Sequence, residues 1–255
     1  MSALALVAHE FRYDQKQFWR DPASVFFTVM LPLIFLFIFA TIFGNDEIES
    51  LQVQTTTYYV PAIISLAVIS ATTQSLAINL VESREGGVLK RVRGTPLPGW
   101  VFIAGRVGNS LVVSALMVVL VAVIGRIVYG VTIPTETLPA VLVTLAAGAF
   151  TFCCIGFALT ALIPSEEAAP AITNATVLPL YFISGIFIPE SEIPDGVLHF
   201  ADAFPVRHFF EAFFEAWDPN TTGAGFALGH LGIVLAWGAA ALVVALLAFR
   251  WEPRR

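Results

Sequence analysis

Side chains that could perform chemistry are few in this chain, and their spacing fits none of the common catalytic sites. Lys16 and Lys90 are the only lysines, and neither follows the glycine pattern of a Walker-type phosphate loop. No Ser, His and Asp triad can be assembled. No carboxylate stands in the middle of an apolar segment, where a proton-driven antiporter would need one. The histidines are scattered without metal-ligand spacing: His9, His199, His208 and His230. We therefore expect a non-catalytic chain with no metal or cofactor of its own.

Charged side chains are instead concentrated in the segment at residues 82–99. Acids and bases are mixed along it: Glu82, Arg84, Glu85, Lys90, Arg91 and Arg93. Val88, Leu89 and Val92 can form the apolar side of a short helix. Gly94 and Pro96 would end that helix. A solvated loop would account for the basic residues alone, but not for the two acids or the apolar ridge. The segment therefore favours a docking surface for a partner protein.

Six apolar segments form the frame that must hold this surface. The chain of 255 residues is 57% hydrophobic and 13% charged, with a mean hydropathy of +0.81, whereas a soluble domain carries about 25% charged residues. About 20 apolar residues span the hydrocarbon core as a helix, because backbone groups in lipid must be satisfied within the segment. We predict one all-α polytopic membrane domain over residues 1–255, with six transmembrane helices at 25–43, 61–81, 104–129, 138–163, 172–188 and 226–249.

Basic residues set the orientation of these spans. Eleven of the 13 Lys and Arg residues fall before the first span, after the second or after the sixth. Such residues mark the cytoplasmic side of a membrane protein, so both termini are expected in the cytoplasm. Charges throughout the first 20 residues leave no apolar core for a cleavable signal peptide.

An amphipathic segment precedes the first span at residues 1–21. Its apolar face contains Phe11 and Phe18, and Trp19 stands where an interfacial aromatic would. We expect a helix that lies in the cytoplasmic headgroup layer and turns into the membrane at Asp21-Pro22. A flexible tail with snorkelling cations is the alternative.

The segment at residues 189–225 carries a second amphipathic run. Aromatic residues cluster on one face after Pro205: Phe209, Phe210, Phe213, Phe214 and Trp217. Such a face would be costly in water, so it should dip into the outer headgroup layer or pack on the spans. We predict a short re-entrant pair of half-inserted helices between spans 5 and 6.

A row of polar side chains runs along the second span. Its members are spaced 7, 3 and 4 residues apart, which places them on one face of a regular helix: Ser65, Thr72, Ser75 and Asn79. A polar row on a spanning helix faces protein or water rather than lipid. It could line a substrate route or hold helices together, and the sequence leaves both interpretations open.

Two motifs resemble the permease subunits of type-2 ABC exporters, the group that includes daunorubicin-resistance and nodulation-factor export permeases. The segment from Glu82 to Leu97 resembles the coupling-helix region of that family. Phe182 to Pro189, followed by Ile193-Pro194, resembles its fifth span and outer-loop signature. The resemblance covers nearly the whole chain. One departure is Gly87, where the family more often has Thr, and this glycine would loosen the start of the coupling helix.

The resemblance implies the partners and the site residues. It implies a homodimer or close heterodimer of permeases in a lipid bilayer, with two cytoplasmic ABC ATPase subunits that bind the ATP and Mg, and no nucleic acid. Residues 1–21 would be a connecting helix, with Phe11, Phe18 and Trp19 at the interface. The segment at 82–99 would dock in the ATPase through Glu82, Arg84, Glu85, Gly86, Leu89, Lys90, Arg91, Arg93 and Pro96. A substrate path at the dimer interface, lined by spans 1, 2 and 5, would contain Ser65, Thr72, Ser75, Asn79, Phe182 and Ser184.

We therefore expect the permease subunit of an exporter in a bacterial plasma membrane. Its cargo would be a hydrophobic or amphipathic molecule, such as an antibiotic, a drug or a lipid-linked compound. The alternative is a secondary transporter or membrane accessory protein that works without an ATPase. The missing mid-span acid argues against proton coupling, and the docking segment argues for an ATPase.

Overall fold

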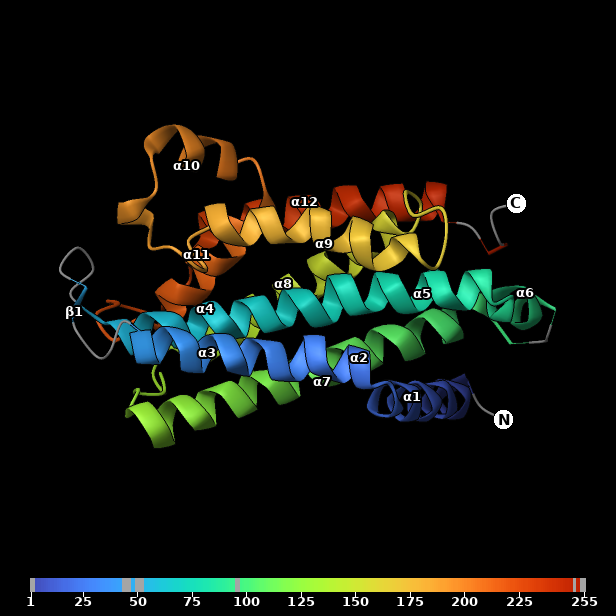
Figure 1. Cartoon of the computed structure of the whole chain (residues 1–255), viewed down its shortest axis with the longest axis horizontal. Helices are drawn as coiled ribbons and strands as arrows, with labels where there is room; N and C mark the ends of the chain where they lie inside the picture. The colour runs from blue at the N-terminus through green and yellow to red at the C-terminus, as the bar shows by residue number, and fades with distance from the viewer. Residues whose placement is uncertain (1–2, 43–46, 49–52, 95–96, 250, 253–255) are drawn as a thin grey trace.

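The computed structural model describes residues 3–42, 47–48, 53–94, 97–249 and 251–252. Most of them are helical, and the helices form an elongated bundle whose long members run along its long axis (Figure 1). The short strands β1 (Glu47–Ile48) and β2 (Val53–Gln54) pair antiparallel at one end of the bundle. An all-α architecture is therefore confirmed.

Within the described residues, four helices are long and apolar enough to cross a membrane. They are the continuous helix Thr55–Glu85, which comprises α4 (Thr55–Ile69), η2 (Ser70–Gln74) and α5 (Ser75–Glu85), together with α7 (Gly99–Tyr129), α8 (Leu138–Leu159) and α12 (Leu228–Ala248). The other two predicted spans are shorter helices. The first runs through α2 (Pro22–Val25), η1 (Phe26–Met30) and α3 (Leu31–Ile42), and the fifth is α9 (Ala168–Ile183). Because the 16 residues of α9 cover only about 24 Å at 1.5 Å per residue, the count of six spans stays a prediction.

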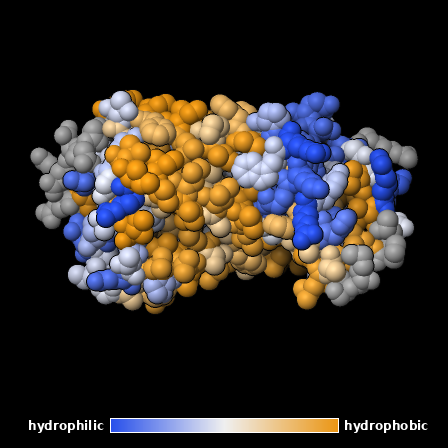
Figure 2. All heavy atoms as spheres, turned by 90° about the horizontal axis from the view of Figure 1, so that it is seen from below, coloured by the Kyte–Doolittle hydropathy of each residue, from blue (hydrophilic) through white to orange (hydrophobic). Residues whose placement is uncertain are grey.

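On the face seen in Figure 2, an apolar belt crosses the middle of the molecule between two more hydrophilic ends. Exposed Val, Leu and Ile side chains of α7 and α12 contribute much of this apolar surface. Such a belt would be unfavourable in water and is what lipid tails solvate. The distribution of polar and apolar surface therefore supports a multi-pass membrane protein.

The helix α4 forms the centre of the bundle, and every one of its residues is buried. α3, α7, α8 and α11 (Pro205–Trp217) pack around it, and α12 covers α8. The helices of the first and second predicted spans each contain a π-helical turn: η1 in the first and η2 in the second. At η1 the cause is Pro32, which has no N–H to donate to the preceding turn, so the helix widens just before it.

The amphipathic segment before the first span is helical, as predicted. α1 (Ala3–Arg20) lies across the end of the bundle and packs against α7 (Figure 1). Phe18 is buried and Phe11 half-buried, while Trp19 is exposed and donates from Nε1 to Gln15 Oε1 over 3.0 Å. The chain then turns at Asp21, and α2 begins at Pro22.

The segment at residues 189–225 forms two short helices, α10 (Asp195–Ala201) and α11, after the turn η3 (Glu190–Glu192). The aromatic face of α11 packs on the ends of α4, α8 and α12, so the second of the two predicted solutions is the one adopted. Phe209 lies against Gly148 of α8 so closely that a Cβ there would be 2.1 Å from the ring. The depth of α10 and α11 in a membrane stays a prediction.

Candidate coupling elbow and substrate groove

The mixed-charge segment forms an elbow at one end of the bundle. The helix α5 ends at Glu85, and Gly86 and Gly87 turn the chain into the short helix α6 (Val88–Arg93) (Figure 1). Gly87 has φ +70° and ψ 11°, a left-handed conformation that favours glycine over any residue with a Cβ. The Arg91 N–H donates to the Gly87 carbonyl over 3.1 Å and so starts α6. The expectation that Gly87 loosens this helix is therefore corrected: glycine allows a defined corner.

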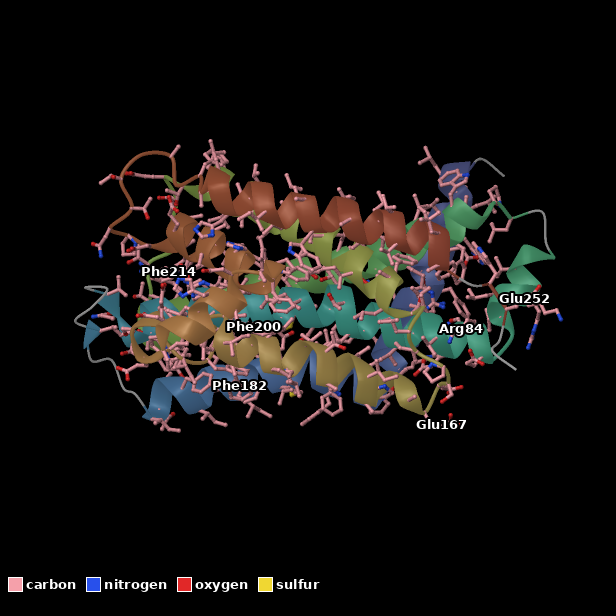
Figure 3. All side chains as sticks on the ribbon, turned by 90° about the horizontal axis from the view of Figure 1, so that it is seen from above. Arg84, Glu167, Phe182, Phe200, Phe214 and Glu252 are labelled. Carbon is pink, nitrogen blue, oxygen red and sulfur yellow. The ribbon has the colours of Figure 1, made fainter. Side chains whose placement is uncertain are left out.

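Arg84 anchors the elbow to α8 instead of facing a partner. Its side chain is only 2% exposed. It donates to the carbonyls of Thr160 (2.8 Å) and Ile163 (2.7 Å), which follow the end of α8, and to Glu85 Oε1 (2.7 Å). Helix C-termini leave such carbonyls without a donor, and a guanidinium can serve both at once. Among the predicted coupling residues, Arg84 is thus a positioning residue inside the protein, and Figure 3 shows it at the same end as Glu167 and Glu252.

The helix α6 is attached to the bundle through its apolar side. Leu89 is fully buried in a cluster with Leu80, Phe102 and Phe157. The predicted outward ridge therefore points largely inward, and Val88, 40% exposed, is the member that remains at the surface. Lys90 and Arg91 are exposed, and Glu82 and Glu85 are half-buried. The side chain of Arg93 and all of Pro96 lie outside the described residues.

A second anchor joins the elbow to α1 and α7. Arg106 of α7 donates to Ser83 Oγ over 2.7 Å and places its Nε 3.4 Å from Asp14 Oδ1. Its guanidinium carbon lies 5.2 Å from the centre of the Phe102 ring. Burial raises the pKa of Asp14 to about 6, and the positive charge of Arg106 only partly opposes this. Three helices therefore meet at one buried ion pair.

Sequence analysis missed Asp14, although a signal for it exists. Asp14 follows Phe11 by three residues and precedes Phe18 by four, so it stands on the apolar face of α1. A carboxylate in that place needs a buried partner. Arg106 had been counted only as one of the basic residues that set the orientation.

A polar groove of about 210 Å³ lies between the first, second and fifth predicted spans. Its walls come from η1 and α3, from η2 and α5, and from α9. Apolar and aromatic side chains form much of its lining, and polar ones are set among them: Asp21, Thr28, Ser70, Gln74, Ser75, Glu82, Asn174 and Tyr181. The three spans around this groove are those that the resemblance implied for a substrate path.

Two hydrogen bonds join η2 to α9 across this groove. Gln74 Nε2 donates to Asn174 Oδ1 over 2.8 Å, and the hydroxyls of Ser70 and Tyr181 are 3.1 Å apart. None of these four residues was predicted. Ser70 and Gln74 are spaced four apart in the second span, and Asn174 carries a strongly polar amide in the fifth, which was the available signal.

The predicted path residues are distributed over several environments. Ser75 lines the groove, whereas Ser65 and Thr72 are fully buried in the bundle, where Thr72 Oγ1 donates to Val68 O over 2.6 Å. Asn79 Nδ2 donates to Ser75 O over 2.8 Å and does not line the groove.

In the fifth span, Phe182 is 52% exposed and packs edge-on against Phe187, while the buried Ser184 donates to Tyr181 O. The predicted row is divided because η2 lies inside it.

The fold defines a multi-pass helical membrane protein, and among the described residues no group of three His, Cys, Asp or Glu side chains could hold a metal ion. Residues 5–216 match the model of the ABC-2 type transporter membrane family, so the chain belongs to that family. It is also similar to a Bacillus subtilis (strain 168) protein named "Putative transport permease YvfS", with 23% identity over 197 residues, 77% of this chain and 79% of that protein. The chain is thus a transport permease by family, a non-catalytic membrane subunit whose family implies an ABC ATPase partner.

Proposed function

We propose that this chain is the permease subunit of an ATP-driven exporter with six membrane spans and both termini in the cytoplasm. Two permease copies, identical or closely related, would associate with two separate ABC ATPase subunits that bind the ATP and Mg. The cargo would be a hydrophobic or amphipathic molecule that leaves the cytoplasm or the inner leaflet. The groove between the first, second and fifth spans would receive it, with Ser75 in its wall.

The observation that carries this proposal is the elbow. The helix α6 projects at one end of the bundle and continues through Gly86 and Gly87 into the 31-residue helix Thr55–Glu85. Ser70, Gln74 and Ser75 of that same helix line the groove. Arg84 and Arg106 join the elbow to α8, α7 and α1, so a force on α6 would act on the bundle and not on a loose loop.

The arrangement at this end supports the proposed orientation. α1, α6 and Glu252, which follows α12, lie at the same end, whereas Phe214 of α11 lies at the other (Figures 1 and 3). Lys16 and Arg20 of α1 and Lys90 and Arg91 of α6 belong to the first of these ends, and basic residues favour the cytoplasmic side.

Purification of the tagged full-length chain from its native membrane tests the proposal. We expect stoichiometric recovery of a subunit with a nucleotide-binding phosphate loop. The variant Lys90→Glu/Arg91→Glu should lose that subunit, because both side chains are exposed on α6. Arg126→Glu, an exposed residue at the far end of α7, is the matched charge-reversal control and should retain it. Transport by the wild-type chain with no ATPase present would contradict the proposal and favour a secondary transporter.

A further inference from the structure

We infer that the groove selects an amphipathic organic cation, an aromatic or apolar body that carries a protonated amine. This inference rests on the proposed function, because it names the class of cargo for the same groove. Three observations support it: the charge of the lining, the aromatic walls, and the backbone carbonyl of Phe27, which lacks its usual hydrogen-bond donor in the next turn. Each is a separate observation.

The charged groups in the lining are all acidic. Asp21 and Glu82 line the groove near the elbow, and no Lys, Arg or His is among its described lining residues. Glu82 also lies within electrostatic reach of Asp21 and Glu166. The nearby cation Arg106 is already engaged with Asp14 and Ser83, and Arg20, which precedes Asp21, does not line the groove. A cargo with a phosphate or carboxylate would find no counter-charge here, whereas an ammonium would find two.

Aromatic rings line the remainder of the groove. Phe27 and Phe35 come from the first span, Tyr181 from α9, and Phe187 from the turn that follows it. Rings attract a cation through their faces and also bind an apolar body. A groove that is acidic at one end and aromatic along its walls therefore matches both halves of an amphipathic cation.

The π-helical turn η1 leaves a backbone hydrogen-bond acceptor beside the groove without its usual donor. The Leu31 N–H donates to the Phe26 carbonyl, five residues back, and Pro32 has no N–H. The Phe27 carbonyl therefore receives no bond from either residue that would normally supply it in the next turn. A protonated amine can donate to such a carbonyl, whereas a quaternary or anionic group cannot.

Equilibrium binding to the full-length permease in phosphatidylcholine nanodiscs tests the inference with two probes of one shape and opposite charge. Tetraphenylphosphonium should bind, and tetraphenylborate should bind at least about tenfold more weakly, a difference of about 1.4 kcal/mol. Glu82→Gln and Asp21→Asn should each weaken the binding of the cation by several-fold and should not weaken the binding of the anion. Glu192→Gln, the same chemical change on an exposed residue of the outer turn η3, is the control.

Equal binding of both probes, or binding of the cation that is unchanged in both acid variants, would overturn the inference. Because the probes bind to the permease itself, this outcome is separate from recovery of an ATPase. If the ATPase is recovered and only neutral or anionic compounds bind, the proposed function stands and the cation inference fails. A comparison of primary and quaternary amines of equal size then tests whether the Phe27 carbonyl accepts a hydrogen bond from the cargo. Tighter binding of the primary amine supports this contact, and equal binding contradicts it.

Discussion

Ionised Asp14 is expected to stabilise the fold less than protonated Asp14 does, even though it faces Arg106. Its side chain is 3% exposed, and burial raises its pKa from 3.8 to about 6 despite the nearby guanidinium. A carboxyl whose pKa is higher in the folded state binds its proton more tightly there. Its contribution to stability is therefore complete below about pH 4 and is lost as the pH rises through 6.

The size of the pKa shift of Asp14 sets how much the free energy of unfolding changes with pH. A rise from 3.8 to about 6 corresponds to about 3 kcal/mol, since each pKa unit is worth about 1.4 kcal/mol. Asp14→Asn removes the titrating group, so its stability relative to the wild type should increase by up to about 3 kcal/mol between pH 4 and pH 8. Arg106→Met removes the charge that opposes the shift, so in that variant the loss of stability should continue above pH 6.

Thermal and denaturant unfolding of the purified protein, followed by helical circular dichroism between pH 4 and 8.5, measures these differences. The wild type at each pH is the reference, so other titrating groups cancel. Asp195→Asn, on an exposed residue of α10, is the control and should show no such pH dependence. An equal effect of Asp14→Asn at pH 4 and pH 8, or a stability relative to the wild type that is lower at pH 8 than at pH 4, would refute the argument that burial outweighs the attraction of Arg106.

Two further predictions concern the elbow and the outer helix. Arg84→Lys should lower stability by about 2 kcal/mol in the same unfolding assay, because an ammonium cannot serve the carbonyls of both Thr160 and Ile163; unchanged stability would contradict the anchoring role. Burial raises the pKa of Glu211 in α11 to about 7, so stability should fall as the pH rises from about 4.5 to 7. Glu211→Gln should remove that slope, and a slope that persists would assign it to another group.

The helical elements were predictable because their cause lies in local composition. All six apolar segments are helical over most of their predicted lengths, and the charged segment contains the short helix α6 that Val88, Leu89 and Val92 indicated. Backbone groups in lipid leave no other choice. The aromatic face of α11 was predictable for a similar reason, since five large rings after Pro205 must be buried somewhere.

The positions of side chains around the groove were less predictable, because they depend on a departure from regular helix geometry. A π-helical turn holds one residue more than a regular turn and so rotates everything after it by about 100°. The row from Ser65 to Asn79 was defined for a regular helix, but η2 lies between its members. Ser70 and Gln74, which stand within that turn, face α9 instead.

The inward orientation of Arg84 could not be predicted, since it depends on where another helix ends. The sequence places this arginine in a charged segment, where solvent or a partner protein would accept the hydrogen bonds of its guanidinium. The fold brings the carbonyls that follow α8 to it, at residues 160 and 163. Such long-range partners have no local signature, whereas Asp14 had one, because it interrupts an apolar helical face.

The elbow and the groove form one mechanical unit in the proposed exporter. Glu82, Ser75 and Gln74 line the groove from the same helix whose end carries Arg84, so a tilt of α6 must move that wall relative to α9. The bonds of Gln74 to Asn174 and of Ser70 to Tyr181 oppose that movement, and they are centred on η2, where the helix is already widened. A helix with a π turn can change its direction there at a lower cost than at a regular turn. The residues that bridge the groove to α9 therefore stand at the π turn, where a push on α6 in the proposed exporter would bend the helix at the lowest cost.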